Sequence, residues 1–184
     1  MSDARVFVIS GPTAVGKGTL VSRVVAAHPE VYVSVSATTR LPRPGEVNGV
    51  HYHFITDATF DELIATAGLL EWATVHQSAR YGTLREPVMT ALAAGRPVIL
   101  EIDVQGAMQV RQTLPDAVLV FITPPSWEEL VNRLRSRSAE TAEQMALRLA
   151  SAKHELALKD MFDHTIVNDE LDIAVSELVE FIGL

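Results

Sequence analysis

The feature that most constrains this chain is a glycine-rich segment near its start, Gly11-Pro12-Thr13-Ala14-Val15-Gly16-Lys17, which fits the pattern G-x-x-x-x-G-K. It follows an apolar run at residues 6–9 and precedes a stretch with apolar residues at helical spacing. A buried strand, a turn and a helix in this order are the setting of a phosphate loop, where backbone N–H groups and the positive end of a helix bind phosphate. Lys17 adds a compact positive charge for the outer phosphates of a nucleoside triphosphate. The alternative is a glycine turn with a solvated lysine, which requires spacing and context to agree by chance.

The residue after Lys17 departs from the general pattern. Gly18 stands where a phosphate loop usually has the Ser or Thr hydroxyl that binds Mg²⁺, and Thr19 follows one place later. We therefore expect Mg²⁺ to be held by phosphates and waters, with little direct ligation by the protein.

Strands alternate with helices along the rest of the chain. This order predicts an α/β fold, a three-layer α/β/α phosphate-loop domain with a largely parallel central sheet. Strands are expected at residues 6–9, 32–36, 51–55, 70–75, 97–103, 117–122 and 165–167. Helices are expected from residue 16 to about 28, at 57–67 with Asp57 as N-cap, at 86–94, from Ser126 to 134, in a long segment ending near 159, and at 171–182.

Composition excludes several classes of function. A length of 184 residues fits one domain, and a net charge of −8 argues against a broad nucleic-acid-binding surface. The absence of cysteine excludes disulfides, thiolate metal sites and cysteine nucleophiles. Since no apolar run approaches the roughly 18 residues of a membrane span, and no signal peptide is apparent, we expect a cytoplasmic protein without membrane, nucleic-acid or obligate protein partners.

Two arginines on one loop are candidates for binding a phosphate monoester. Arg40 and Arg43 lie three residues apart in a segment with prolines that limit its freedom, so two guanidinium groups can reach one phosphate. Tyr52 and Tyr81 can each add a hydroxyl donor. The alternative is a pair of solvated arginines.

Acidic residues form the second group of candidates. Glu101 and Asp103 end a predicted buried strand, and the period of two points both side chains to the same side, at the carboxyl edge of the sheet. They either face a nucleotide and metal or cap the next helix. Glu71, beside Trp72, is from the residues alone either a site carboxylate or a surface acid on an edge strand.

Several segments together resemble guanylate kinases. They cover nearly the whole chain, in the order and near the spacing of that family. The segments are Ser34 to Phe54, Glu71-Trp72-Ala73, Tyr81-Gly82-Thr83, Asp103-Val104-Gln105-Gly106, Pro124-Pro125-Ser126 and Val167-Asn168-Asp169. The resemblance implies a kinase that transfers the γ-phosphoryl group of ATP to GMP with Mg²⁺, and it leaves open a preference between GMP and dGMP.

The resemblance also implies an organisation and a set of site residues. It divides the domain into a core (1–34, 87–125 and 157–184), a GMP-binding subdomain (35–86) and a mobile lid (126–156). It implies that Arg40, Arg43, Tyr52 and Tyr81 bind the GMP phosphate, and that Glu71, Ser36 and Thr83 read guanine. Glu101 and Asp103 then contact GMP or the water shell of Mg²⁺, and Asn168 lies on the adenine side.

For the reaction itself, the resemblance implies catalytic arginines on the lid, Arg133, Arg137 and Arg148, which act with Lys17 and Arg40. Without the resemblance, such an arginine-rich helix would be a solvated face. The transfer is expected to be in line, with charge spread over the equatorial oxygens and without a general base. The segment from Gly11 to Thr19 binds ATP.

The chain departs from the family at three places. Ala14 replaces a frequent glycine in the phosphate loop, residues 77–80 lack the usual pattern, and Ser138 stands where the lid often has glycine. One rival hypothesis is a binding module that has lost catalysis, which Gly11, Gly16 and Lys17 oppose. Another is a kinase for AMP, UMP or CMP, which Glu71, Ser36 and Thr83 oppose.

Overall fold

The computed structural model describes residues 5–75, 79–137 and 141–184, apart from the side chain of Arg137. Its centre is a five-stranded sheet in the order β2-β7-β1-β8-β9, and all neighbouring strands are parallel. The strands are β1 Val6–Ser10, β2 Tyr32–Val33, β7 Val98–Glu101, β8 Val118–Thr123 and β9 His164–Val167. Because the five strands run in one direction, their carboxyl ends meet at one edge, where ligands bind in open α/β sheets.

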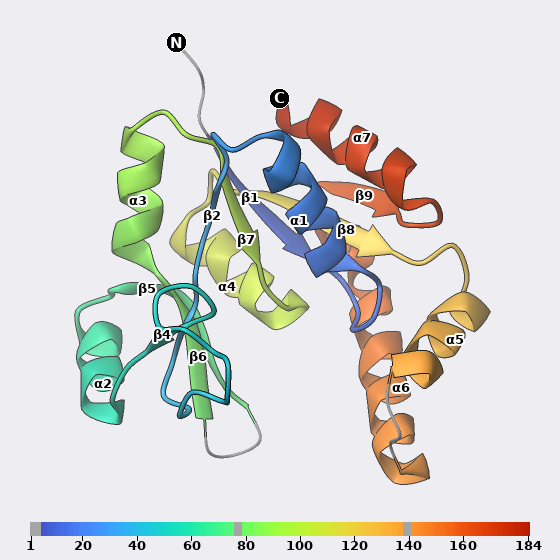
Figure 1. Ribbon diagram of the computed structural model, residues 1–184, viewed down its shortest axis with the longest axis horizontal. Helices are drawn as coiled ribbons and strands as arrows, with labels where there is room; N and C mark the ends of the chain where they lie inside the picture. The colour runs from blue at the N-terminus through green and yellow to red at the C-terminus, as the bar shows by residue number, and fades with distance from the viewer. Residues whose placement is uncertain (1–4, 76–78, 138–140) are drawn as a thin grey trace.

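Helices cover both faces of this sheet (Figure 1). In β1, Phe7 and Ile9 pack on one face while Val6 and Val8 pack on the other, which explains the uninterrupted apolar run. The first face is covered by α1 Lys17–Ala27 and α7 Leu171–Ile182, the second by α3 Arg85–Ala93 and α4 Val104–Thr113. The predicted three-layer α/β/α domain with a parallel sheet is confirmed.

A second sheet, with one helix, forms a separate lobe, which we call the sheet lobe. Its strands follow the order β4-β3-β6-β5, and β6 runs antiparallel to both β3 and β5. The elements are β3 Ala37–Thr38, β4 His53–Phe54, α2 Asp57–Ala65, β5 Leu69–Val75 and β6 Ala79–Leu84. Strand β6 is not among the strands predicted from the sequence, and neither is this second sheet.

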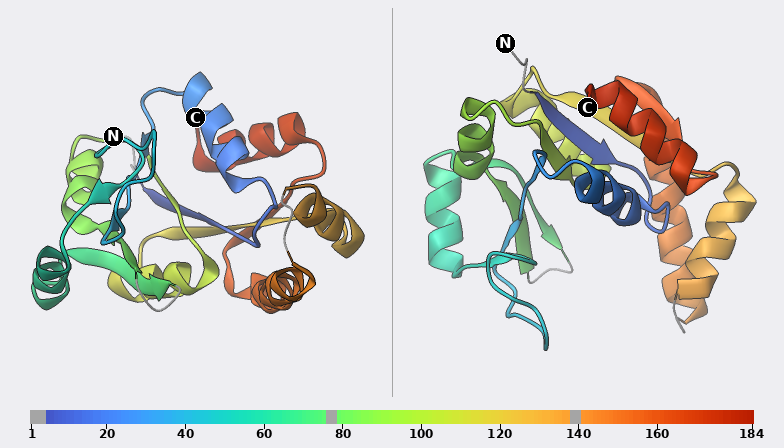
Figure 2. Two further views of the ribbon diagram at one scale, coloured as in Figure 1. Left: turned by 60° about the horizontal axis from the view of Figure 1, so that its bottom comes forward. Right: turned by 45° about the horizontal axis from the view of Figure 1, so that its top comes forward.

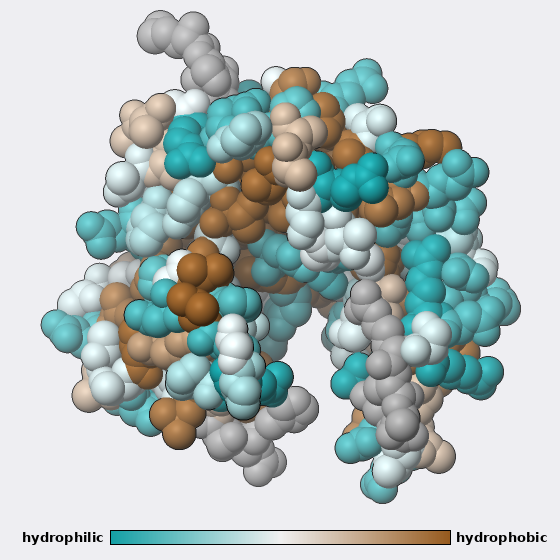
Figure 3. All heavy atoms as spheres, viewed as in Figure 1, coloured by the Kyte–Doolittle hydropathy of each residue, from teal (hydrophilic) through white to brown (hydrophobic). Residues whose placement is uncertain are grey.

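Two helices form a further lobe, which we call the helical lobe. It contains α5 Trp127–Arg137 and most of α6 Ala142–Ala157, after which comes the short 3-10 helix η1 Lys159–Met161. Leu130, Leu134 and Ala152 form a small apolar cluster between the two helices. The sheet lobe and the helical lobe extend from the same side of the central sheet (Figure 2). The space-filling view shows a cleft between them (Figure 3).

Element boundaries differ slightly from those predicted. The N-cap of α2 is Thr56, not Asp57: the Thr56 hydroxyl accepts a hydrogen bond from the Thr59 N–H, and Asp57 begins the helix. The helix expected to begin at Ser126 begins at Trp127, and the Ser126 hydroxyl before it accepts a hydrogen bond from the Glu129 N–H. Within residues 5–75, 79–137 and 141–184, none of the helices has the length and apolar character needed to cross a membrane.

Candidate active site

The phosphate loop connects β1 to α1 at the carboxyl edge of the sheet. Gly11 has a φ of 143°, and a Cβ there would lie 2.2 Å from the Ile122 carbonyl oxygen, so only glycine fits. Gly16, with a φ of 97°, caps α1. The Lys17 ammonium donates to the carbonyl oxygens of Gly11 at 2.5 Å and Pro12 at 3.1 Å. The loop is thus formed around its own lysine, beside a cavity of about 380 Å³ lined by loop residues and Glu101.

Ala14 has an unusual backbone conformation within this loop. Its φ is 67°, in the left-handed region that residues with a Cβ rarely adopt. Its side chain is buried among Leu130, Leu134 and Ala152 of the helical lobe. The methyl group that strains the backbone therefore also joins the loop to that lobe.

Asn168 follows β9 and is 5% exposed. Its side-chain amide donates to the Val15 carbonyl at 2.8 Å, and a Cβ at Gly16 would lie 2.6 Å from the same amide nitrogen. Its backbone carbonyl accepts from Arg133 at 3.0 Å. The structure places Asn168 against the phosphate loop, and its contact with adenine stays a prediction.

The two predicted acids lie at the end of β7. Both Glu101 and Asp103 line a cavity of about 320 Å³ between the central sheet and the sheet lobe. Asp103 is also the N-cap of α4, accepting from the Gly106 N–H at 2.7 Å, so the helix-capping interpretation is confirmed, and its contact with a nucleotide or metal stays a prediction. The Glu101 carboxylate lies within 3.3 Å of where a Cβ at Gly18 would be. Desolvation of the carboxylate by the surrounding protein raises the pKa of Glu101, and the positive charge of Lys17 opposes that rise.

Glu71 and Thr83 stand opposite each other on β5 and β6. Glu71 lines the same cavity. Glu71 is only 8% exposed, and one of its carboxylate oxygens, Oε1, accepts from the Thr83 hydroxyl at 2.7 Å. Burial raises the pKa of Glu71, the Thr83 hydrogen bond lowers it, and the nearby negative charge of Asp103 raises it further. Ser36 lines the cavity as well. The three residues expected to read guanine are therefore brought together.

Arg40 contacts an acid and also Tyr81, a tyrosine that lines this cavity. Its guanidinium forms a two-pronged ion pair with Glu46, at 2.8 and 2.9 Å, and donates to the Tyr81 hydroxyl at 3.1 Å. Glu46 also accepts from the backbone N–H of Arg43, and these bonds lower its pKa to about 2, with Arg40 as the main cause. The Arg40 guanidinium lies 5.4 Å from the ring centre of Tyr52. Arg43 itself is exposed.

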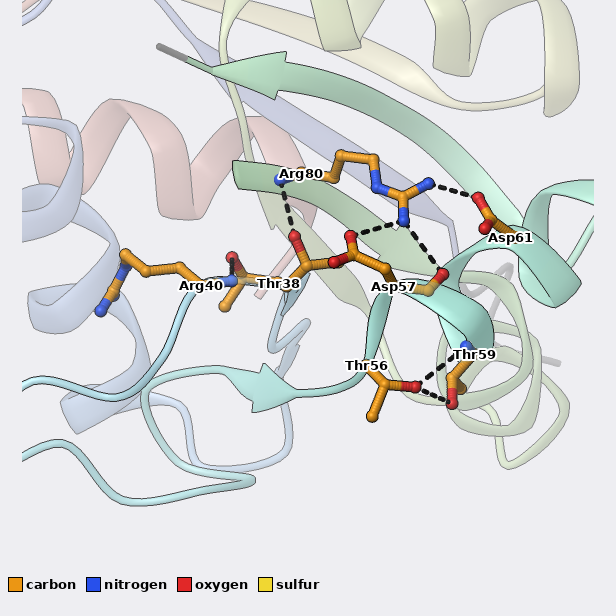
Figure 4. Close-up of polar contacts among 8 residues, drawn as sticks. Thr38, Arg40, Thr56, Asp57, Thr59, Asp61 and Arg80 are labelled. Atoms are coloured by element: carbon orange, nitrogen blue, oxygen red, sulfur yellow. Dashed lines mark hydrogen bonds and ion pairs between the residues drawn. The ribbon is translucent and has the colours of Figure 1, made fainter. Parts of the chain in front are cut away.

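Arg80 connects three elements of the sheet lobe (Figure 4). Its guanidinium pairs with Asp57 at 2.7 Å and with Asp61 at 2.5 Å, both on α2, and stacks on Phe60 at 4.7 Å. Its backbone exchanges hydrogen bonds with Thr39, the residue before Arg40. From the sequence, Arg80 is predicted only to depart from the family pattern, and Glu46 has no predicted role. A signal for Glu46 exists, because an acid three residues after Arg43 shares its proline-containing loop.

The predicted catalytic arginines of the helical lobe are less closely assembled. Arg133 on α5 donates to Glu129 and to the Asn168 carbonyl, each at 3.0 Å. Arg148 is exposed on α6. The side chain of Arg137, together with residues 77, 78 and 138, lies outside the described residues. The structure therefore brings Arg133 to the phosphate loop through Asn168.

A phosphate loop at the edge of a parallel sheet, facing a second polar cavity in a separate lobe, defines a phosphoryl-transfer enzyme of the phosphate-loop class. A family model for guanylate kinase matches residues 3–183. The chain therefore belongs to the guanylate kinase family, whose members phosphorylate GMP to GDP with ATP. The expectations of a kinase and of this reaction are confirmed.

Individual relatives agree with this assignment. The chain is 58% identical over 179 residues to a guanylate kinase of Cutibacterium acnes, covering 97% of this chain and 90% of the relative. It is 56% identical over 177 residues to one of Gloeobacter violaceus, covering 96% and 85%. Among solved structures, the guanylate kinase of Anaplasma phagocytophilum superposes with a TM-score of 0.76 at 27% identity, over 99% of this chain and 86% of that one.

Proposed function

We propose that the cavity beside Glu71 binds the guanine of GMP. The observation that carries this proposal is the buried Glu71 carboxylate, which Thr83 orients toward a polar cavity. Guanine presents donors at N1 and N2, which a carboxylate accepts, whereas adenine has no donor at N1. A buried carboxylate left facing an acceptor would lose its hydrogen bonds, which makes the site selective.

The GMP phosphate is proposed to bind between Arg40, Arg43, Tyr52 and Tyr81. Arg40 already contacts Tyr81 and is paired with Glu46. The Glu46 carboxylate accepts hydrogen bonds from the Arg40 guanidinium, as a phosphate would. Phosphate binding then exchanges one anion for another on Arg40. Tyr52 and Tyr81 line the same cavity as Glu71, and Tyr81 contacts Arg40. A single nucleotide is therefore proposed to reach from Glu71 to Arg40.

ATP is proposed to bind along residues 11–19, with its phosphates on the loop and Asn168 near the adenine side. Mg²⁺ fits beside this loop, because the Glu101 carboxylate occupies the space next to Gly18 and hard oxygen donors suit this cation. Thr19 and Asp103 are the other candidate oxygens. Among the described residues, clusters of three or more metal-ligating side chains are absent, so phosphates and waters would complete the coordination. The ion screens the charge of the triphosphate.

During transfer, a GMP phosphate oxygen attacks the γ-phosphorus of ATP in line. Arg40 and Arg43 orient that oxygen and reduce the repulsion between the two phosphates. Lys17 leaves the loop carbonyls for the transferring group, and Arg133, Arg137 and Arg148 add positive charge as the helical lobe closes like a lid. Closure excludes water, which would otherwise hydrolyse ATP.

The test is ADP formation from ATP and Mg²⁺ with GMP, AMP, UMP or CMP as acceptor, for the natural chain and for Lys17→Ala and Glu71→Gln. We expect turnover with GMP, a loss of about 10³-fold in Lys17→Ala without weaker GMP binding, and a loss of about 100-fold in kcat/KM for GMP in Glu71→Gln. Arg23→Ala, which removes an exposed ion pair with Asp172, is the control. Unchanged GMP kinetics in Glu71→Gln would refute the proposed guanine site.

A further inference from the structure

Helix α4 belongs to the core, but one of its faces contacts the sheet lobe. Asp103, Gly106, Gln109 and Thr113 are spaced by three or four residues, so they lie along one side of the helix. This side faces β5, the edge strand that carries Glu71. The Thr113 hydroxyl donates to the Leu70 carbonyl at 2.6 Å. The strand that bears the proposed guanine-reading carboxylate is thus held by a helix from outside its own lobe.

Gln109 makes the most specific of these contacts. Its side-chain oxygen accepts from the Trp72 N–H at 3.1 Å, and its side-chain nitrogen donates to the Trp72 carbonyl at 3.0 Å. The amide thus pairs with the backbone of β5 as a neighbouring strand would, at the residue next to Glu71. This pairing fixes where Glu71 lies relative to the core.

Gly106 contributes by the absence of a side chain. It is buried, and a Cβ built on it would lie 2.9 Å from Oε2 of Glu71 and 3.3 Å from its carboxyl carbon. The other oxygen, Oε1, is held by Thr83. An added methyl group would therefore push the carboxylate away from its present place and strain the bond with Thr83. Within a helix interior, by contrast, alanine is favoured over glycine.

We propose that Gly106 and Gln109 are positioning residues for guanine selection: Gly106 leaves the space that the Glu71 carboxylate occupies, and Gln109 fixes the strand that carries it. The inference rests on the proposed guanine site. Its consequence is that base selectivity depends on core residues that do not themselves contact the base.

The experiment compares GMP with IMP, which lacks the 2-amino donor of guanine. The readouts are kcat/KM for each acceptor, the KM for ATP and the melting temperature. The variants are Gly106→Ala, Gln109→Leu, Glu71→Gln and the double variant Glu71→Gln with Gly106→Ala. Gln112→Leu is the matched control, because Gln112 is an exposed glutamine on the same helix.

For Gly106→Ala we expect the ratio of kcat/KM for GMP to that for IMP to fall about tenfold or more, since the carboxylate can no longer accept both guanine donors. The KM for ATP should stay within about twofold, and the melting temperature should hold or rise because the helix is strengthened. For Gln109→Leu we expect the ratio to fall about threefold to tenfold, since water can replace part of the lost pairing. In the Glu71→Gln background, Gly106→Ala should change the ratio by less than about twofold, as expected if it acts through Glu71.

Each other outcome is informative. An unchanged ratio in Gly106→Ala, with a lowered ratio in Glu71→Gln, would overturn this inference and leave the proposed guanine site standing. An unchanged ratio in Glu71→Gln would refute the guanine site itself. Equal losses for GMP, IMP and ATP together with a lower melting temperature would reduce both residues to a general structural role and also overturn the inference.

Discussion

The two sides of the cleft are prepared for their ligands in different ways. In the sheet lobe, charged side chains contact other side chains: Glu71 contacts Thr83 on the neighbouring strand, and Arg40 contacts Glu46 on its own loop and Tyr81 on β6. On the phosphate-loop side, the cations also bond to the protein backbone. Lys17 bonds to carbonyls of its own loop and Arg133 to the Asn168 carbonyl.

The difference suggests how specificity and catalysis are separated. A network of side chains fixes the geometry of the acceptor site before GMP binds, so this site can discriminate between bases on first contact. Bonds from a cation to neutral carbonyls can be exchanged for bonds to ATP phosphates, which are stronger acceptors of hydrogen bonds from charged donors.

The largest effect is expected from removing Arg40, the cation of the side-chain network in the sheet lobe. Arg40→Ala removes a phosphate donor and leaves Glu46 as an uncompensated negative charge, so the KM for GMP should rise about 100-fold while the KM for ATP stays nearly unchanged. Adding Glu46→Gln should recover part of this loss, because the remaining repulsion is removed. Steady-state kinetics of both variants provide the measurement. A double variant no better than Arg40→Ala would show that Glu46 does not oppose the phosphate.

The second effect is a pH dependence confined to the acceptor side. Burial raises the pKa of Glu71, so in the ligand-free protein its charge is lost at a higher pH than for an ordinary glutamate. As pH falls through that raised pKa, GMP affinity should weaken by up to about tenfold per pH unit, because binding must first remove the proton. Calorimetric titrations of GMP, with Glu71→Gln to subtract the titration of the GMP phosphate, measure this. Equal pH profiles for the two proteins would contradict the prediction.

The burial of Glu71 also makes the stability of the fold depend on pH. A carboxylate whose pKa is raised by folding destabilises the fold once pH exceeds its unfolded value, and stability declines until the folded pKa is passed. We therefore expect ligand-free Glu71→Gln to melt at a higher temperature than the natural chain at pH 7 and to lose that advantage in acid. Scanning calorimetry at the two pH values tests this, and a lower melting temperature at pH 7 would count against it.

A smaller effect is expected from removing Arg80, whose backbone bonds to Thr39 beside Arg40. Arg80→Ala breaks the pairs with Asp57 and Asp61 and loosens the strand next to Thr39 and Arg40, so the KM for GMP should rise about fivefold to tenfold with kcat little changed. Binding of guanosine, which lacks the phosphate, should be unaffected. Arg23→Ala is again the control for loss of an exposed ion pair. Equal weakening of guanosine and GMP would show a general loosening of the lobe.

The smallest effect concerns the phosphate loop. Ala14→Gly relieves a left-handed backbone at φ 67° but removes a methyl group packed against Leu130 and Leu134. The two contributions are each about 1 kcal/mol and of opposite sign, so unfolding free energy should change by less than about 1 kcal/mol. Chemical denaturation measures it. A larger loss of stability would mean that the packing outweighs the strain.

Much of this molecule could be predicted from sequence because its signals are local. The apolar run of β1 and the glycines of the phosphate loop predict their own structure, and the spacing of Arg40 and Arg43 predicts a phosphate site. Strand β6 could not be predicted, since Ala79 to Leu84 has polar residues and a glycine and depends on pairing with β3 and β5. The same holds for the Gln109–Trp72 pairing, which joins residues 37 positions apart.

The attachment of α4 to β5 also determines which motions of the sheet lobe keep the base in place. Strand β5 lies at the core-facing edge, while β3, from which the Arg40 loop departs, is two strands away and β4 three. A rotation of the lobe about the α4–β5 contact would therefore move Glu71 least and Arg40 most. Such an axis would let the phosphate end of GMP move toward ATP while the base keeps its hydrogen bonds. GMP would then stay bound throughout the rotation of the lobe.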